Sequence, residues 1–586
     1  MGKLTIALAT AAALAISAPA AAAPADDFHA VMNDYWAAFL KDNPIRATFT
    51  GVTTYDRELG TLTLAELDRQ TAEAAAFLAR LDHIPTAQLT SADQANYAIL
   101  HRLLAEQVEA NKFGQRQIFY SSNGSLHAFL ARLGEQQPFH GYADYDNYLA
   151  RISQLREQLG NLADISRKAA TEGYVQPCVT LGNVENSITG VISADPTKSR
   201  FYAPFAGNKP ATVTDAQWAD LQGRARTLIT GSINPAYQNW ATVYRKDVAP
   251  KCSKDIAVSA QPQGKEYYAF LVRQQTTTNL TPDQIHELGL KEVARIRAEM
   301  DEVASKAGYP SRAAMIAKMR TDPKYFAKTP EELMAAAALM AKTIDGKMPT
   351  LFTKLPRLPY GVKPIPLAEA EGNTTAYYVD GSPDAGIAGT YFVNTTHLDQ
   401  RPLWELPALT VHEAVPGHHM QIATQQELEM PAWRKYNAFF TAFVEGWGLY
   451  SERLGIEMGI YDTPEKDMGR LGYEMWRAAR LVVDTGIHSK GWSKERAVAF
   501  MKDNTTLTDA NIDAEVNRYI STPGQALAYK LGELKIRELR ARAEKELGSK
   551  FDLRRFHDAV IGQGSVPLDA LDAQINAWIA SEKGRS

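Results

Sequence analysis

Residues 411–421 read VHEAVPGHHMQ, and this stretch carries the strongest functional motif in the chain. It places three of the 12 histidines of the chain close together, with Glu413 directly after His412. A histidine followed by a glutamate, with a further histidine downstream, is the arrangement in which zinc hydrolases hold their metal and activate water. His412 and a second histidine are therefore candidate metal ligands, and Glu413 is the candidate general base.

The spacing differs from the common HExxH pattern, in which two histidines four positions apart share one helical face. Four positions after His412 stands Pro416, and the next histidines are His418 and His419. On a straight helix at about 100° per residue, His418 would lie roughly 120° away from the face of His412. Since Pro416 breaks helices and Gly417 tolerates an unusual backbone, the sequence predicts an interrupted helix that brings the second histidine back toward the first.

A third ligand is expected from the next long helix, which is predicted over residues 431–458. Glu445 lies in this helix between Phe443 and Trp447. An ionised glutamate in such apolar surroundings is costly unless it is paired or binds a metal. The alternative is a glutamate that faces solvent on an amphipathic helix.

The predicted ligands of a zinc ion (Zn²⁺) are therefore His412, His418 and Glu445. Three protein ligands with one open position are typical of catalytic rather than structural zinc. His419 is the rival of His418 and otherwise a candidate substrate contact, although Gly417 favours His418 because it leaves room for a tight turn. The same ligand types also suit manganese, cobalt or iron.

The N-terminal residues carry the pattern of a cleaved secretory signal. Residues 1–3 are a short basic start, residues 4–16 are apolar, and residues 17–23 are small and alanine-rich. This order is typical of a signal peptide, and the apolar run is shorter than the roughly 20 residues that a membrane span needs. We therefore expect residues 1–23 to be removed, leaving a periplasmic or secreted protein without a membrane attachment.

The overall composition is that of a large globular protein. The chain has 586 residues, a net charge of −4 and 45% hydrophobic residues, which gives no reason to expect nucleic acid as a partner. Export permits a disulfide between Cys178 and Cys252, but sequence cannot give the distance that a bridge requires, so two free thiols remain an alternative. No cysteine lies near the cleavage region, so a bacterial lipid anchor is not expected.

Helical patterns dominate the chain, and strand-like alternation is scarce. Helices are predicted over residues 26–39, 62–81, 91–109, 145–162, 215–244, 283–306, 331–344 and 431–458. Thr281 and Thr329 are the expected N-caps of two of them, each followed by a proline at the first helical position. A mainly helical protein follows.

The clearest strand signal lies just upstream of the histidine cluster. Residues 375–379 and 389–394 are rich in aromatic and β-branched side chains and flank a turn-rich loop, which predicts two strands. An edge strand near a peptidase site can pair with an extended peptide, so Tyr391 is a candidate substrate-binding residue. The alternative is a small structural hairpin.

Two polar clusters in the C-terminal third are candidates for stabilising an oxyanion and holding a substrate. The first contains Arg480 and His488 on one predicted helix, and the second contains Arg518, Tyr519 and Tyr529. Tyrosine and histidine are neutral donors, so Tyr529 and His488 are candidate catalytic residues. Arg480, Arg518 and Tyr519 are candidate substrate-binding residues, because arginine suits a terminal carboxylate. The alternative for each is an ordinary buried salt bridge or hydrogen bond.

At these segments the chain resembles a large bacterial family of unknown function, DUF885. The matching segments are Leu271–Pro282, Gly389–Asn394, His412–Gln421, Phe443–Glu452, Arg480–His488, Arg518–Tyr519, Pro523–Ala526 and Phe556–His557. The sequences HEAVPGHH and FVEGWGLYSE are highly specific together. The resemblance implies a mainly α, two-lobed helical zincin-like fold of the gluzincin type, with a small β-sheet near the active site. It is similar to helical zinc carboxypeptidases and to oligopeptidases such as neurolysin, in which the metal lies at the floor of a deep channel.

The resemblance also bears on the choice of histidine. Compared with helical peptidases that carry HExGH, the Gly-His pair aligns with Gly417 and His418, which supports His418 over His419. It further implies that the unusual spacing is the pattern of the family. We expect an N-terminal helical lobe over residues 24–260 and a metal-binding catalytic lobe over residues 261–586, unless both share one core.

The favoured hypothesis is an exported zinc metallopeptidase that hydrolyses short peptides, as a carboxypeptidase or an oligopeptidase. Two alternatives stay open. One is a zinc hydrolase of another amide or ester substrate, and the other is a non-catalytic periplasmic protein that binds peptides or metal. Glu413 beside His412 argues against the last alternative, since a protein that only binds needs no base there.

Overall fold

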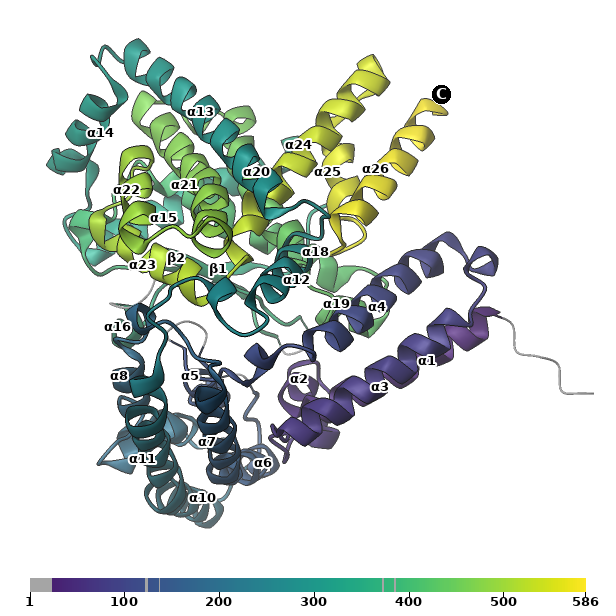
Figure 1. The fold of residues 1–586 in the computed structure, drawn as a ribbon, viewed down its shortest axis with the longest axis vertical. Coiled ribbons are helices and arrows are strands. Elements are labelled where there is room, and N and C mark those ends of the chain that lie inside the picture. The colour runs from purple at the N-terminus through teal and green to yellow at the C-terminus, as the bar shows by residue number, and fades with distance from the viewer. Residues whose placement is uncertain (1–23, 122–124, 136, 371–373, 384–385, 586) are drawn as a thin grey trace, which may run out of the picture.

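The computed structural model describes all residues except 1–23, 122–124, 136, 371–373, 384–385 and 586 (Figure 1). The chain is 71% helical and has a small three-stranded sheet, so the prediction of a mainly helical protein is confirmed. The predicted signal peptide lies outside the described residues. Within the described residues, no helix combines the length and the apolar character needed to cross a membrane.

In the first half of the chain, every secondary-structure element of the described residues is a helix. Its helices are α1 (Pro24–Asp42), α2 (Pro44–Phe49), α3 (Leu64–Asp82), α4 (Ser91–Ala110), α5 (Leu126–Leu130), α6 (Tyr142–Ser153), α7 (Leu155–Glu172), α8 (Val184–Thr189), α9 (Ala203–Ala206), α10 (Asp215–Leu228), α11 (Asn234–Val243) and α12 (Gly264–Thr276). The helix predicted over residues 215–244 is divided, because a π-helical turn at Ile229–Ile233 separates α10 from α11. The helix predicted over residues 145–162 is likewise divided at Gln154.

The second half contains the longest helices. They are α13 (Pro282–Lys306), α14 (Arg312–Thr321), α15 (Pro330–Asp345), α16 (Leu367–Ala370), α17 (Leu406–Glu413), α18 (His418–Glu427), α19 (Ala432–Tyr436), α20 (Thr441–Met458), α21 (Pro464–Lys490), α22 (Lys494–Asn504), α23 (Asp509–Ser521), α24 (Ala528–Leu547), α25 (Leu553–Ile561) and α26 (Leu568–Lys583). Thr281 and Thr329 cap α13 and α15 as predicted, since each side chain accepts a hydrogen bond from the backbone N–H three residues on.

The prediction of one continuous helix over residues 431–458 is wrong. This stretch consists of α19 and α20, which are separated by an extended segment that ends at Phe440. The backbone N–H of Phe440 donates to the hydroxyl of Ser565 at 3.0 Å. A partner from a distant part of the chain thus fixes this break.

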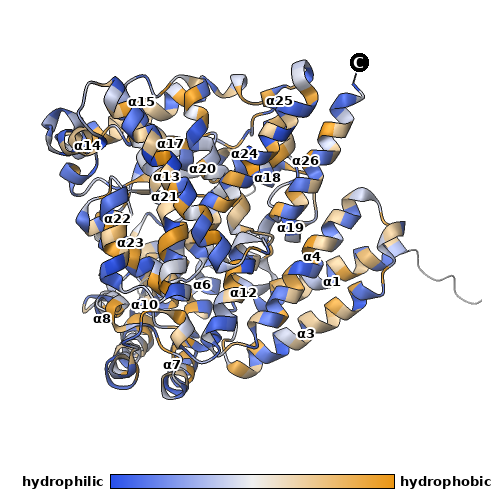
Figure 2. Ribbon diagram, turned by 45° about the horizontal axis from the view of Figure 1, so that its top comes forward, coloured by the Kyte–Doolittle hydropathy of each residue, from blue (hydrophilic) through white to orange (hydrophobic). Residues whose placement is uncertain are grey.

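Buried side chains from both sides of residue 260 share one hydrophobic cluster. Phe28 and Leu104 belong to the same buried cluster as Trp447 and Ile575, so α1, α3 and α4 pack with the C-terminal half. A second cluster is drawn almost entirely from residues 120–248, which form the lower group of helices, α5 to α11, in Figure 1. The hydropathy colouring shows apolar and polar stripes alternating along single helices (Figure 2), as expected for helices that bury one face.

Cys178 and Cys252 are joined by a disulfide. The bond lies within the second cluster of helices and closes a segment of 74 residues. Beside it, the backbone N–H of Cys178 donates to the carbonyl of Ser253 at 2.8 Å. The pairing that the sequence left open is therefore present.

The sheet has the order β1-β3-β2, with β1 (Tyr360–Pro364) parallel and β2 (Ala376–Val379) antiparallel to the central β3 (Gly389–Val393). Both predicted strands are confirmed, whereas β1 lies in a proline-rich segment for which no strand was predicted. Its proline stands at the last position of an edge strand, where a missing N–H is tolerated. Tyr391 in β3 is fully buried, and its hydroxyl lies 3.4 Å from that of Thr410 in α17. The sheet is thereby held against the helix that carries His412.

Candidate metal centre

A tight turn between α17 and α18 brings the two halves of the histidine motif together. In this turn the N–H of Gly417 donates to the carbonyl of Val411 at 3.0 Å, and the indole N–H of Trp447 donates to the carbonyl of Pro416 at 2.8 Å. A Cβ atom on Gly417 would lie only 2.0 Å from the carbonyl oxygen of His412. Glycine is therefore required here, and the interruption that the sequence predicted is present.

His412, His418 and Glu445 converge on one point. Oε2 of Glu445 lies 3.5 Å from Nε2 of His412 and 3.5 Å from Nε2 of His418. The candidate ligand atoms of the three side chains all lie within 4.8 Å of one another. The imidazole rings are nearly perpendicular, with centroids 4.7 Å apart. Two helices and the turn between them thus supply the histidines, and α20 supplies the carboxylate.

The spacing of these atoms fits a small metal ion. Zinc bonds to nitrogen and oxygen are about 2.0–2.1 Å long, and a tetrahedral angle then separates the ligand atoms by about 3.4 Å. Within the described residues, the buried atoms Oε2 of Glu445 and Nδ1 of His418 have no hydrogen-bond partner. The side chains of His418 and Glu445 are 12% and 17% exposed, so the group can be reached from outside.

The electrostatics of the group favour a positive charge between the three side chains. Burial raises the pKa of Glu445, but the neighbouring imidazoles of His412 and His418 outweigh it and hold this pKa well below its usual range. Burial lowers the pKa of His412, but the Glu445 and Glu452 carboxylates outweigh it and raise this pKa to about 10. The carboxylates therefore favour a cation at the imidazole nitrogen atoms. This cation is either a proton or a metal ion.

Glu452 and Arg477 belong to this group, although the sequence did not single them out. Oε1 of Glu452 accepts a hydrogen bond from Nδ1 of His412 at 2.8 Å and lies 3.4 Å from Nη2 of Arg477. Glu452 stands seven residues after Glu445 in α20, and two helical turns return it to nearly the same face. That spacing, within the motif of Glu445, is the signal that could have identified it.

The predicted base Glu413 ends α17 beside His412 and is only partly buried. Burial raises the pKa of Tyr391, the hydrogen bond with Thr410 lowers it, and Glu413 raises it further. Tyr391 is fully buried in the sheet, however, so its side chain supports the site from behind and is not exposed to a substrate.

His419 points away from the other two histidines. Its Nδ1 atom accepts a hydrogen bond from the hydroxyl of Tyr378 at 2.9 Å, and its Nε2 atom donates to the carbonyl of Leu358 at 2.9 Å. The side chain is buried, and burial lowers its pKa to about 4. Both ring nitrogens therefore form hydrogen bonds within the protein, to Tyr378 in β2 and to Leu358 just before β1. Neither nitrogen is left for a metal or a substrate.

Three of the predicted C-terminal residues are engaged with the protein itself. Arg480 donates from Nη2 to Glu515 at 3.0 Å and from Nε to the hydroxyl of Tyr519 at 3.1 Å. His488 accepts from the N–H of Val258 at 3.1 Å and donates to the carbonyl of Tyr519 at 2.9 Å. All three side chains are buried. The geometry gives Arg480, Tyr519 and His488 structural contacts in place of the expected substrate-binding and catalytic ones.

Arg518 and Tyr529 bond to each other, and they differ in burial because the side chain of Tyr529 is buried. Nη2 of Arg518 donates to the hydroxyl of Tyr529 at 3.2 Å, and the Arg518 side chain is 30% exposed. The guanidinium of Arg480 stacks on the ring of Tyr529 at 4.4 Å and on Trp476 at 4.5 Å. Since Arg477 stacks on Trp476 as well, at 4.3 Å, this cluster adjoins the group of His412, His418 and Glu445 through α21.

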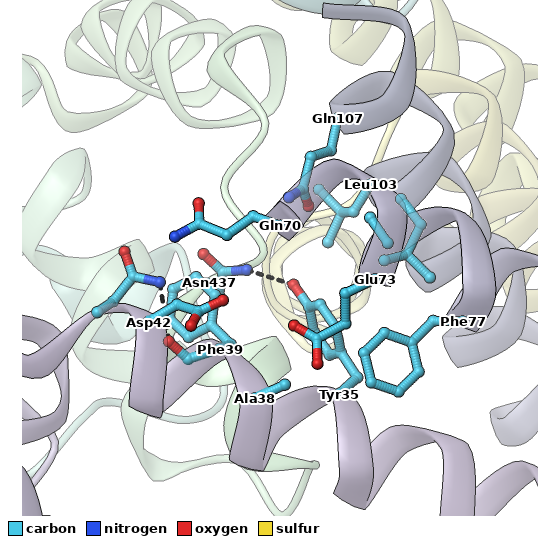
Figure 3. Close-up of a pocket in the computed structure, with 13 residues that line it drawn as sticks. Tyr35, Ala38, Phe39, Asp42, Gln70, Glu73, Phe77, Leu103, Gln107 and Asn437 are labelled. Atoms are coloured by element: carbon cyan, nitrogen blue, oxygen red, sulfur yellow. Dashed lines mark hydrogen bonds between the residues drawn. The ribbon is translucent and has the colours of Figure 1, made fainter. Parts of the chain in front are cut away.

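A pocket of about 300 Å³ lies elsewhere, between the N-terminal helices and Asn437 (Figure 3). Its lining residues are Tyr35, Ala38, Phe39, Asp42, Asn43, Gln70, Glu73, Ala74, Phe77, Leu103, Leu104, Gln107 and Asn437. The side chain of Asn437 donates to the hydroxyl of Tyr35 at 2.7 Å. None of the predicted site residues lines this pocket.

The fold and the site together define a mainly helical protein with a small sheet beside a candidate metal centre. Residues 44–575 match the family described as "Bacterial protein of unknown function (DUF885)". The match covers most of the chain, so the chain belongs to this family. No curated protein matches it.

Two solved structures are similar over nearly the whole chain. A "putative lipoprotein" from Colwellia psychrerythraea superposes with a TM-score of 0.89 at 27% identity, covering 95% of this chain and 100% of that one. A "putative lipoprotein of unknown function" from Shewanella oneidensis gives a TM-score of 0.70 at 19% identity, with the same coverage, and shows the fold alone. Neither description names an activity.

Proposed function

We propose that this protein is an exported zinc-dependent peptidase that hydrolyses short peptides. In this proposal His412, His418 and Glu445 hold the metal, and Glu413 is the general base. We further propose that the fold is that of a two-lobed zincin-like peptidase.

This proposal rests on the position of Oε2 of Glu445. This buried oxygen has no hydrogen-bond partner among the described residues and lies 3.5 Å from two imidazole nitrogens. The charges around it agree. The carboxylates of Glu413, Glu445 and Glu452 surround His412 with an excess of negative charge, which the guanidinium of Arg477 beside Glu452 reduces. A divalent cation would balance the excess, and a buried excess of negative charge is otherwise unfavourable.

When bound, zinc acts as a Lewis acid that polarises a carbonyl group and favours the ionisation of water. The carboxylate of Glu413 takes up the proton of the attacking water and returns it to the nitrogen of the leaving amine. General base catalysis of this kind contributes about 10²- to 10⁴-fold to a rate. The partial exposure of Glu413 and His418 allows a substrate to reach both side chains.

A peptide substrate is supported by the sheet next to the site. β2 is an edge strand, and its neighbour β3 lies against α17. Edge strands bind extended peptides through their main chain. Arg518 is partly exposed, and a guanidinium suits the carboxylate at the end of a peptide. The disulfide fits an exported protein, because such bonds persist in oxidising compartments.

The experiment is to purify the mature chain without chelators, measure its metal content, and incubate it with a mixed peptide library that is read by mass spectrometry. About one zinc per chain together with cleaved peptides supports the proposal. Zinc without peptide cleavage would favour another amide or ester substrate or a binding role. A chain that neither contains zinc nor takes it up would contradict the proposal.

A further inference from the structure

We infer that Glu452 and Arg477 are positioning residues that fix the tautomer and the orientation of His412. This inference rests on the proposed function, because it concerns how the chain prepares one ligand for a metal ion. It assigns a role to two buried side chains that do not themselves face the ligand position.

The hydrogen bond between His412 and Glu452 decides which ring nitrogen carries the proton. A neutral imidazole has one N–H and one lone pair, and an ionised carboxylate only accepts hydrogen bonds. When His412 is neutral, as a metal ligand must be, its Nδ1 atom, at 2.8 Å from Oε1 of Glu452, therefore carries the proton. The lone pair is left on Nε2, which is the atom that lies 3.5 Å from Oε2 of Glu445. A lone pair aimed at a carboxylate oxygen is unfavourable unless a cation lies between them.

Arg477 stabilises the buried charge of Glu452. The side chain of Glu452 is 2% exposed, and a charge buried to this degree is costly without a partner. Nη2 of Arg477 lies 3.4 Å from Oε1 of Glu452. The guanidinium is itself held in place, since it stacks on the rings of Trp476 at 4.3 Å and Tyr473 at 4.6 Å. The pair thus connects α21 to α20, and through Glu452 to the end of α17.

His412 and His418 differ in the hydrogen bonds of their Nδ1 atoms. Within the described residues, Nδ1 of His418 is buried without a hydrogen-bond partner, so no side chain selects its tautomer. The orientation of His412 is selected by a carboxylate and stabilised by a guanidinium. Residues that orient a metal ligand in this way typically contribute 10- to 100-fold to metal affinity.

The test compares the chain with its variants Glu452→Gln and Arg477→Met. Glu457→Gln is the matched control, because Glu457 lies on the same helix but is partly exposed and binds Arg540 at 2.7 Å. Zinc dissociation constants are measured by competition with a chromophoric chelator. The visible absorption of the cobalt-loaded proteins reports the ligand geometry, and the melting temperature of the metal-free proteins reports stability.

We expect Glu452→Gln to weaken zinc binding about 10- to 100-fold and to alter the cobalt spectrum, while Glu457→Gln changes neither. Arg477→Met should weaken zinc in the same direction, and it serves if Glu452→Gln does not fold. Wild-type affinity and an unchanged cobalt spectrum in both variants would overturn this inference and leave the proposed function standing. If the unaltered chain binds neither metal, the proposed function fails and the inference fails with it.

Discussion

The backbone of Gly448 lies directly against the imidazole ring of His412. A Cβ atom on Gly448 would be 2.8 Å from Cε1 and 3.0 Å from Nε2 of that ring, whereas carbon atoms in favourable contact are about 3.5–4.0 Å apart. The absence of a side chain at this position therefore sets how closely α20 approaches His412. Because Glu445 lies one turn earlier in α20, the same contact sets the distance between the carboxylate and the imidazole.

Gly448→Ala should therefore displace the ring of His412 and weaken zinc binding by about 10-fold, since overpacking typically costs ~1–3 kcal/mol. The measurement is zinc affinity by chelator competition, with the melting temperature as a check on folding. Gly223→Ala in α10 is the control, because an added Cβ there meets no atom within 4 Å. That substitution should leave the affinity unchanged. A Gly448→Ala variant with wild-type affinity would show that the contact does not position the ring.

The two neighbouring histidines should behave in opposite ways. His418→Asn should weaken zinc binding at least about 100-fold, because each ligand of a zinc site contributes several kcal/mol. His419→Asn should retain the metal, because its ring nitrogens bond to Tyr378 and Leu358, and should instead lower the melting temperature. Metal analysis after dialysis separates the two. Loss of zinc from His419→Asn alone, with His418→Asn still loaded, would reverse the assignment.

Glu413→Gln should keep the metal and lose hydrolysis by about 10²- to 10⁴-fold, since the amide cannot accept the proton. The substitution preserves the shape of a side chain that follows His412 at the end of α17. The rate is measured on a peptide identified from the library, and the zinc content is measured on the same sample. Full activity in this variant would remove Glu413 from the role of general base.

His488→Gln distinguishes a structural from a catalytic histidine. Burial lowers the pKa of His488 to about 4, from 6.5 in the unfolded chain, and the hydrogen bond to Tyr519 only partly opposes this. Between these pH values the unfolded chain binds a proton that the folded chain does not. The free energy of unfolding therefore falls as the pH falls through this window, by about 3 kcal/mol. A glutamine keeps one donor and one acceptor but does not titrate.

We therefore expect the melting temperature of His488→Gln to fall less between pH 7 and pH 4.5 than that of the unaltered chain, with hydrolysis at pH 7 retained. The exposed His101 provides the control His101→Gln. An unchanged pH dependence of melting would contradict the structural role. A large loss of turnover without a change in melting would return His488 to the catalytic residues.

Removal of the disulfide should destabilise the helices that it closes. The double variant Cys178→Ser with Cys252→Ser frees a segment of 74 residues, for which the chain-entropy model gives a loss of about 4 kcal/mol. The melting temperature should fall, and a reducing agent should lower that of the unaltered chain but not that of the variant. Equal melting temperatures for all four samples would mean that the bond does not contribute to stability.

The convergence of His412, His418 and Glu445 could be predicted because residues close to them in sequence indicate it. Pro416 and Gly417 mark the break in the helix, and Glu413 follows His412 directly. Glu445 stood out because an acidic residue in an aromatic helix needs a partner. The contacts of Glu452 with His412 and with Arg477 could not be predicted from neighbouring residues in the sequence. They depend on which faces of α20 and α21 meet, and this is set by packing between segments distant in sequence.

Other parts of the fold were missed for similar reasons. The break before α20 is stabilised by the hydrogen bond between Phe440 and Ser565. The residues next to Phe440 in sequence do not predict this break. The strand β1 pairs with β3 across an intervening segment, although its prolines predict an irregular loop. Arg480 and His488 looked like site residues because polar groups in an apolar helix suggest function. α21 is buried over most of its length, so these groups instead bond to α23 and to Val258.

X-ray absorption at the zinc edge, on the chain loaded with one equivalent of zinc, shows whether His412, His418 and Glu445 hold one zinc ion. We expect four or five nitrogen and oxygen neighbours at about 2.0–2.1 Å, including the scattering pattern of two imidazole rings. This pattern should be lost in Glu445→Ala and in His412→Ala. A spectrum without imidazole scattering, or one unchanged in both variants, would mean that these side chains do not hold the ion.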